Sequence, residues 1–315
     1  MKYKLMAAAA AGVVLVFLVF PQVVSESATE GLLMWFQVVL PALLPFSIVS
    51  TLLLRLGMTD TITKVVAPFI GKLLGISRKG CYPVVVGMLS GYPLGAATVA
   101  HLCRSGEITT KEGNYILHFC NNASPMFLME YIGVSCLGWK QPIKVLVFVY
   151  AAGFLGCVLE RILQKSGKKR QKKEEEKLSR EETPVPKDGQ KKVSFMQALD
   201  ESIMSSFTIL TKVGGYIMLF SIVAGVIRQG CLISTENKAL LSGLLEITVG
   251  AKDITAAFQG RAAVSCLMGF VAFGGLSSAA QTASVIRDAG LSMKSYLLAK
   301  VRQGIIAMVL VWFFG

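Results

Sequence analysis

The stretch Ser90-Gly-Tyr-Pro-Leu-Gly95 decides the fold, because it interrupts an apolar segment that runs from residue 82 to residue 103. Glycine and proline inside a helix leave backbone groups without partners. At membrane depth such an interruption persists only where protein or a water-filled cavity pairs those groups. If the chain lies in a membrane, this stretch predicts a helical hairpin whose tip is packed inside the protein.

The composition places the chain in a membrane. Hydrophobic residues make up 53% of the 315 residues and charged residues only 16%, whereas soluble proteins carry about a quarter charged residues. The charges gather in a few stretches and leave apolar segments of roughly the 20 residues that a spanning helix needs. We therefore expect an all-α polytopic membrane protein, with the lipid bilayer as its first partner.

The formal net charge of +13 does not indicate nucleic acid as a partner. Lys and Arg concentrate at 164–193, without an aromatic residue to stack on bases and without a nucleic-acid motif. Such a basic loop is typical of the cytoplasmic side of a membrane protein. The seven cysteines are scattered singly, with no CxxC or Cys/His cluster, so neither a metal nor another cofactor is expected.

Apolar segments and helix breakers together predict the elements of the chain. Residues 5–20 form either a retained first helix, which we predict, or a cleavable signal peptide. Further apolar segments are expected at 32–56, 82–103, 115–137, 143–163, 213–227, 240–249, 262–286 and 297–314, with an amphipathic helix at 195–212.

The distribution of charge assigns the sides of the membrane. Basic residues place 57–81 and 164–193 in the cytoplasm. Three full crossings between these stretches would put the second one outside, so one segment must enter and leave on the same side. The broken segment 82–103 is the best candidate for this re-entrant hairpin. Residues 262–286 carry a second glycine-rich break at 272–278 and are expected to be re-entrant as well, which returns the C-terminus to the cytoplasm.

The two halves of the chain share a pattern. Phe46-Ser-Ile-Val49 recurs as Phe220-Ser-Ile-Val223, and further along Gly91 corresponds to Gly275. Because the two copies cross the membrane in opposite directions, we predict inverted repeats with discontinuous helices. Secondary transporters are commonly built this way, with the substrate site between the repeats. The predicted units are an N-terminal helix at 1–25, a first repeat at 26–163, the basic loop at 164–194 and a second repeat at 195–315.

Five short motifs carry a resemblance to a known family. They are Leu40-Pro-Ala-Leu-Leu-Pro-Phe46, Ser90-Gly-Tyr-Pro-Leu-Gly-Ala96, Asn121-Asn-Ala-Ser-Pro125, Leu245-Glu-Ile-Thr-Val-Gly250 and Ala272-Phe-Gly-Gly-Leu-Ser-Ser278. From about residue 30 to 314, the basic loop apart, the chain resembles the Gate, or nucleoside-recognition, family of bacterial membrane proteins, and within it a sporulation branch. The resemblance implies a fold related to nucleoside transporters and a place in the bacterial inner, forespore or mother-cell membrane. The asparagine usual in the second hairpin of those transporters is not evident in the last motif, so no particular solute is implied.

Glu246 is the first candidate for a solute site. It lies between Leu245 and Ile247. A carboxylate in hydrocarbon costs about 2.5–3.5 kcal/mol, so such residues usually face a cavity or an ion path. Glu246 would then bind solute or carry a coupling proton. In the other interpretation it caps a short helix or pairs with Lys212.

The remaining candidates lie at the helix breaks. The polar residues ahead of Pro125 either contact a polar solute or pair the backbone groups that the proline frees. The hairpin tips either bind an anionic or carbonyl-bearing solute through free N–H groups, or pack closely through small residues. The predicted substrate-binding residues are Glu246, Thr248, Asn121, Asn122, Ser124, Gly91, Tyr92, Gly95, Gly275, Ser277, Ser278 and Gln281.

The sequence predicts no enzyme, because it has no Ser/His/Asp or HExxH pattern and no phosphate-binding glycine loop. We expect a transporter-like sporulation membrane protein that binds or moves a small polar solute by a gate mechanism. The alternative is a membrane assembly or envelope factor, needed for the spore cortex or coat, that keeps the fold without transport. The expected protein partners are further copies of the chain or other sporulation membrane proteins.

The predicted topology can be tested by cysteine labelling. A single reporter cysteine at residue 106, in a chain whose native cysteines are replaced, should react with a membrane-impermeant maleimide only from the cytoplasmic face. Labelling from the outer face would contradict the re-entrant hairpin at 82–103 and the inverted repeat that depends on it.

Overall fold

The computed structural model describes residues 11–12, 14–167, 194–230 and 232–315. Most of the basic loop, the start of the predicted N-terminal helix and Cys231 lie outside these ranges. The described residues are helical, with no strand among them. Five of the helical runs are long and apolar enough to cross a membrane: Pro21–Arg55, Ile143–Glu160, Phe195–Gly230, Gly260–Ile286 and Met293–Phe314. The all-α polytopic class is therefore confirmed.

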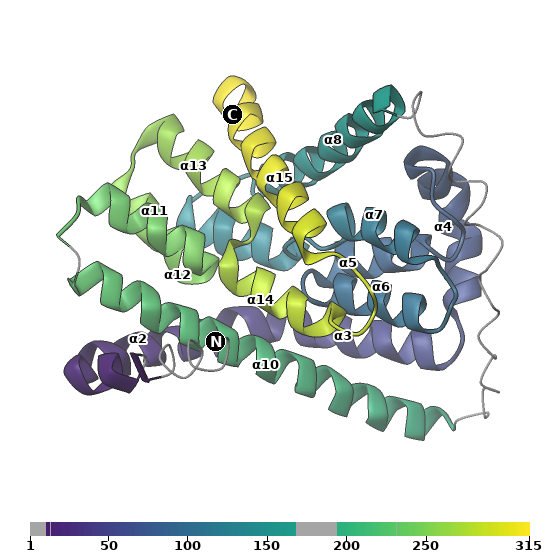
Figure 1. Ribbon diagram of the computed structural model, residues 1–315, viewed down its shortest axis with the longest axis horizontal. Helices are drawn as coiled ribbons and strands as arrows, with labels where there is room; N and C mark the ends of the chain where they lie inside the picture. The colour runs from purple at the N-terminus through teal and green to yellow at the C-terminus, as the bar shows by residue number, and fades with distance from the viewer. Residues whose placement is uncertain (1–10, 13, 168–193, 231) are drawn as a thin grey trace.

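The two longest apolar runs lie along each other in opposite directions (Figure 1). Near one end a Cβ on Gly31 would lie 2.7 Å from the Ser221 hydroxyl oxygen, and near the other end Ser47 donates a 2.9 Å hydrogen bond to Ser206. Residue numbers therefore increase in opposite directions along the two runs, which makes the runs antiparallel. The first run consists of α2 (Pro21–Met34), a wide π-helical turn η1 (Trp35–Val39) and α3 (Leu40–Arg55), and the second is α10 (Phe195–Gly230).

α10 corrects one expectation of the sequence. An amphipathic helix at 195–212 and a separate span at 213–227 were predicted, but one continuous helix covers both. The glycines at this junction do not break it, because α2 and α3 support the helix along both parts. Gly214 leaves room for the Trp35 indole, which donates a 2.8 Å hydrogen bond to the Leu210 carbonyl.

The first half continues with a surface helix and an antiparallel pair. Three apolar side chains of the surface helix are exposed along one stripe, Val65, Phe69 and Leu73, as is typical of a helix lying at a membrane interface. The antiparallel pair closes through glycines, since Gly87 and Gly95 pack directly on each other. The elements are α4 (Thr59–Leu74), α5 (Cys81–Ser90) and α6 (Leu94–Arg104), followed by α7 (Thr110–Cys120), η2 (Phe127–Cys136) and α8 (Ile143–Gly167).

The second half continues after α10 with five further helices among the described residues. Side-chain caps begin several of its helices: Ser234 accepts the Asn237 N–H, and Ser292 accepts the Ser295 N–H. The elements are α11 (Thr235–Leu245), α12 (Ile247–Ala257), α13 (Gly260–Phe273), α14 (Gly275–Ile286) and α15 (Met293–Phe314).

The position of the second antiparallel pair differs from the expectation. A hairpin was predicted at 262–286, but the helices that fold back on each other are α11 and α12, where a Cβ on Gly250 would lie 2.3 Å from the Gly243 Cα. α13 instead leads on into α14 through Gly274 (Figure 1). A glycine break allows the helix axis to bend by many angles, and the helices packed on either side determine the angle that forms. α13 packs along α15, whereas α14 packs against α10, α6 and α11.

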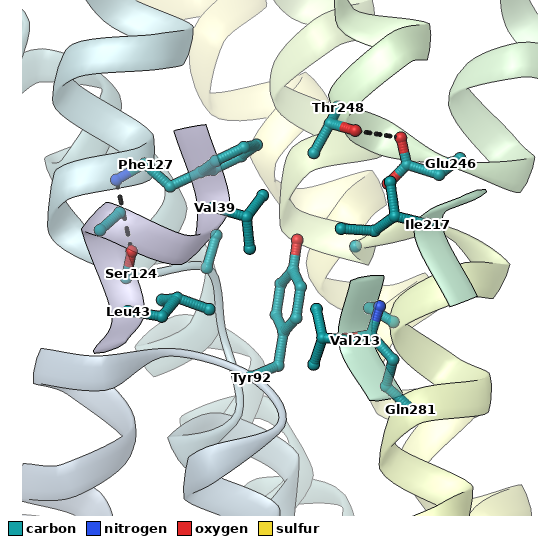
Figure 2. Close-up of a pocket in the computed structure, with 14 residues that line it drawn as sticks. Val39, Leu43, Tyr92, Ser124, Phe127, Val213, Ile217, Glu246, Thr248 and Gln281 are labelled. Carbon is teal, nitrogen blue, oxygen red and sulfur yellow. Dashed lines mark hydrogen bonds between the residues drawn. The ribbon is translucent and has the colours of Figure 1, made fainter. Parts of the chain in front are cut away.

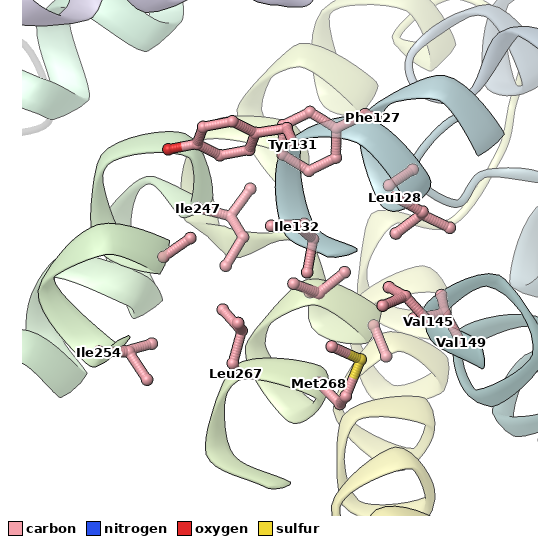
Figure 3. Close-up of a cluster of buried hydrophobic side chains, with 14 of the residues drawn as sticks. Phe127, Leu128, Tyr131, Ile132, Val145, Val149, Ile247, Ile254, Leu267 and Met268 are labelled. Atoms are coloured by element: carbon pink, nitrogen blue, oxygen red, sulfur yellow. The ribbon is translucent and has the colours of Figure 1, made fainter. Parts of the chain in front are cut away.

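The main core joins the two halves of the chain (Figure 3). Around it, large apolar side chains point outward, and Phe69 and Phe314 are 78% and 77% exposed. Such a surface suits lipid rather than water. The core is built from residues of η2, α8, α12 and α13, among them Phe127, Leu128, Ile132, Val145, Val149, Ile247, Ile254, Leu267 and Met268.

The contact between Gly243 and Gly250 should limit the stability of the second pair. Gly250→Ala would drive a methyl group into the backbone of α11, and overpacking of this kind costs about 1–3 kcal/mol. We expect a lower Tm for the detergent-purified variant. The control is Gly215→Ala in α10, where a Cβ meets nothing within 4 Å and a gain in helix propensity of up to ~1 kcal/mol is expected. Equal Tm values for the two variants would contradict the close approach.

Candidate functional site

Four interruptions of helices meet in the middle of the protein. Tyr92, at the α5–α6 turn, donates its backbone N–H to the Asn122 carbonyl in the α7–η2 break, at 2.8 Å. The Tyr92 ring also lies beside Gly274 in the α13–α14 break, and Gly275 packs on the Leu245 carbonyl at the α11–α12 turn. The breaks of both halves are thus in contact.

Asn121 pairs the groups that these breaks leave open. Its side-chain carbonyl accepts the backbone N–H of Ala96 at 3.2 Å, near the start of α6. Its amide nitrogen donates to the hydroxyls of Thr282 and Tyr296, each at 2.9 Å. Because Asn121 is only 1% exposed, one buried amide connects α6, α7, α14 and α15. The Asn121 side chain thus pairs the Ala96 N–H and forms hydrogen bonds between helices.

A cavity of about 30 Å³ lies beside this junction (Figure 2). That volume holds about two water molecules. Tyr92 stands at its centre, between α3 and α10, and its hydroxyl points toward the side where Glu246 and Thr248 lie (Figure 2). The lining consists of Val39, Ala42, Leu43, Tyr92, Ala123, Ser124, Phe127, Val213, Ile217, Glu246, Thr248, Gly274, Ser278 and Gln281.

Glu246 is both a helix cap and a wall of the cavity. Its Oε2 atom accepts the backbone N–H of Val249 at 2.9 Å and the hydroxyl of Thr248, so it caps α12. The side chain is 2% exposed, and no ion pair involves it in the described part of the chain. Lys212, the partner considered from the sequence, is exposed on α10. The carboxyl group therefore brings acceptor oxygens to the cavity without a paired cation among the described residues.

The other polar groups of the cavity add to its acceptor character. The amide nitrogen of Gln281 donates to Ser277 at 3.2 Å, while the carbonyl oxygen of Gln281 is buried without a partner among the described residues. Ser278 donates to the Gly275 carbonyl, and Ser124 accepts the Phe127 N–H. A carboxylate and a free carbonyl favour a ligand with a positive charge or N–H and O–H donors. This differs from the anionic solute that free helix N-termini suggested.

The predicted site residues fall into two groups. Tyr92, Ser124, Glu246, Thr248, Ser278 and Gln281 line the cavity. The others pack around it: Gly91 lies against the Ser124 backbone, Gly95 against the Cys120 carbonyl and Gly275 against α11, while Ser277 supports Gln281. Asn121 and Asn122 belong to the hydrogen-bond network next to the cavity.

Lys300 is the polar residue of this region that the sequence analysis missed. It lies in α15 and is 1% exposed, and its ammonium group contacts the α7–η2 break. In the sequence it stands near the start of a span, close to Arg302, where basic residues usually reach the membrane surface. The helical spacing of Lys300 and Gln303, which places both on one face of α15, was the available signal.

A second polar cluster joins α7, α8 and α15 below the break. The two ring nitrogens of His118 lie 2.8 Å from Glu160 Oε2 and 2.8 Å from the Ser295 hydroxyl. Arg302 donates to the same Glu160 oxygen at 2.7 Å. Within the described residues no three His, Cys, Asp or Glu side chains are grouped to hold a metal ion. This cluster is thus an internal ion-pair network between three helices.

These features define a class of protein. Five candidate spans, broken helices with paired backbone groups and a lipid-facing apolar surface make the chain an α-helical, multi-pass integral protein of the cell membrane. The chain is 30% identical, over 324 residues, to the sporulation integral membrane protein YlbJ of Bacillus subtilis strain 168, and the match covers 92% of this chain and 77% of that protein. The chain therefore belongs to the family of this sporulation integral membrane protein.

No family model matches the chain, and no solved structure matches it. The resemblance to the Gate family accordingly stays a prediction, whereas the relation to the sporulation membrane protein is established by the identity over most of both chains.

Proposed function

We propose that this protein is a membrane carrier for a small polar solute, and that the solute brings a positive charge or hydrogen-bond donors to the central cavity. One observation carries the proposal: Glu246 and Gln281 line one cavity where four helix breaks meet, and the Gln281 carbonyl is buried without a partner among the described residues. Buried acceptors without donors are costly, and a donor-bearing ligand would relieve them. Membership in the sporulation family supports a role during spore formation.

The order of the elements supports an inverted repeat as the basis of transport. In the first half a long apolar run is followed by the surface helix α4, an antiparallel pair, a broken helix and a spanning helix. The second half has no counterpart of α4 among the described residues but otherwise has the same order, in α10, α11–α12, α13–α14 and α15. The two long runs are antiparallel, and the pairs α5–α6 and α11–α12 lie at opposite ends of the molecule (Figure 1). Carriers with such repeats rock one element against another around a fixed site.

The volume of the cavity limits which solutes fit without a movement of the surrounding helices. Space for about two waters accommodates a small cation or one functional group of a larger solute. A solute as large as a nucleoside requires the Tyr92 ring and the α5–α6 tip to leave the centre. The tip is held by the Tyr92–Asn122 hydrogen bond and by Asn121, so these contacts form the gate in this proposal.

The alternative function, an assembly or envelope factor, also has an observation in its favour. Glu246 already caps α12 through two hydrogen bonds, which accounts for a buried carboxylate without any solute. A factor of this kind needs the cap but not the negative charge.

The distribution of basic residues between the two ends of the molecule supports a revised topology. In this topology α13–α14 crosses the membrane and does not form a re-entrant hairpin. The loops with most basic residues meet at one end, where Lys79 pairs with Glu107 and the Ser292 N–H bonds to Asn114. At the other end Arg261 donates to the Trp312 carbonyl, which brings the C-terminus beside the α12–α13 connection. By the positive-inside rule the first end is cytoplasmic and the C-terminus lies outside.

A reporter at the C-terminus tests this topology. Alkaline phosphatase fused after Gly315 should be active in a bacterial host, and green fluorescent protein at the same position should stay dark. The matched control carries the same reporters within residues 168–193, where the pattern should reverse. A fluorescent C-terminal fusion would contradict a full crossing by α13–α14.

The solute site is tested by Glu246→Gln, which removes the charge but keeps a carbonyl to accept the Val249 N–H. Purified wild-type protein should gain Tm with at least one member of a panel of ammonium, methylammonium, guanidinium, sodium, nucleobases and nucleosides, because a ligand stabilises the state that it binds. The gain should vanish in Glu246→Gln and persist in Glu130→Gln, which alters an exposed acid. Dicarboxylates should give no gain.

Two outcomes would count against the carrier. Equal shifts for wild-type protein and Glu246→Gln would separate the ligand from the carboxylate. Silence across the panel, with Glu246→Gln as stable as wild-type protein and able to support spore formation, would favour the assembly factor.

A further inference from the structure

Lys300 is a buried charge that the proposed solute site does not use. Its Nζ atom donates to three oxygens: the Asn121 carbonyl at 3.3 Å, the Asn122 Oδ1 at 2.8 Å and the Gln303 Oε1 at 3.1 Å. Three acceptors require three N–H donors, which an ammonium group has and a neutral amine lacks. The geometry thus fits an ammonium group at a position that is 1% exposed.

The charge of Lys300 is balanced by oxygens and not by a carboxylate. No ion pair of Lys300 occurs in the described part of the chain, and the Glu160 carboxylate pairs with His118 and Arg302. α7 ends at Cys120, directly before the Asn121 carbonyl, so the ammonium sits at the negative end of a half-helix. This is an electrostatically favourable place for a cation in a membrane interior.

Two carbonyls near the end of α7 accept hydrogen bonds from side chains. The Phe119 carbonyl accepts the Asn122 amide at 2.9 Å, and the His118 carbonyl accepts the Gln303 amide. These bonds turn the remaining oxygens of Asn122 and Gln303 toward Lys300. Membrane carriers hold coupling ions with unwound backbone carbonyls and the C-terminal ends of half-helices. Here one peptide carbonyl and two side-chain amide carbonyls gather at such an end.

We propose that Lys300 is a tethered cation, whose ammonium group permanently fills a monovalent-cation site at the end of α7. The site adjoins the gate, because Asn122 contacts Lys300 through its side-chain oxygen and accepts the Tyr92 N–H of the α5–α6 tip with its backbone carbonyl. In a carrier where a free ion occupied the site at the end of α7, the α5–α6 tip could pack in place only when that ion was bound. Here the ion is part of the chain, so docking of the tip is independent of sodium and potassium. The inference goes beyond the proposed function and holds for a carrier and an assembly factor alike.

The test removes the Lys300 ammonium group by substitution and adds free monovalent cations in its place. Wild-type protein, Lys300→Ala and Lys300→Met are purified without solute, and Tm is measured in equal concentrations of sodium, potassium, lithium, methylammonium and choline chloride. Wild-type protein should melt at one temperature in all five salts. Lys300→Ala should melt lower in choline and regain Tm, saturably, with at least one small cation.

Two controls separate the site from general salt effects. Lys300→Met fills the space with an uncharged chain, so its Tm should be low and the same in every salt. Lys212→Ala removes an exposed lysine from α10 and should behave as wild-type protein. Because no solute is present, the result does not depend on the outcome at Glu246.

The proposal is overturned if Lys300→Ala melts at the same temperature in all salts, or if Lys300→Met gains as much as Lys300→Ala. Should Lys300→Ala fail to fold in choline, the same salts are supplied during solubilisation and purification. Recovery of folded protein with a small cation alone would support the tethered cation. Failure in every salt would overturn it, since the native oxygens should accept a free ion.

Discussion

The structure depends on one constraint: backbone groups freed at a helix break in a membrane must find partners within the protein. Asn121 meets this constraint at the centre, since its side chain serves the start of α6, Thr282 of α14 and Tyr296 of α15. The same residue's carbonyl receives Lys300. Removal of one such partner leaves a buried polar group unpaired, which costs about 1–3 kcal/mol. The break and its partners therefore form a single unit.

Two buried charges lie on either side of this unit. Glu246 faces the cavity in which Tyr92 stands, and Lys300 holds the carbonyls behind the α5–α6 tip. Neither has an ion-pair partner among the described residues, and each is held by hydrogen bonds at a half-helix end: Glu246 at the start of α12 and Lys300 at the end of α7. The positive end of one helix dipole and the negative end of another suit these charges.

Part of the site could be predicted from the sequence. Glu246 stood out because an acid in an apolar stretch is locally visible, and its capping role was one of the two interpretations. Lys300 was not predicted to be buried, because a lysine near the start of a span resembles a surface residue until its contacts in the fold are known. The preference for a donor-bearing ligand that we propose was not predicted, since it depends on Gln281 lining the same cavity as Glu246 with its carbonyl unpaired among the described residues.

By itself the sequence determined the membrane class, most of the apolar segments and the breaks at 91–93, 121–125 and 274–275, because hydropathy and helix-breaking residues act locally. Only the tertiary structure decided what each break does. Gly274 was expected to reverse the chain, yet α13 is held along α15 and the reversal lies between α11 and α12. A break frees the backbone, but helices distant in the sequence choose the bend angle and supply the hydrogen-bond partners.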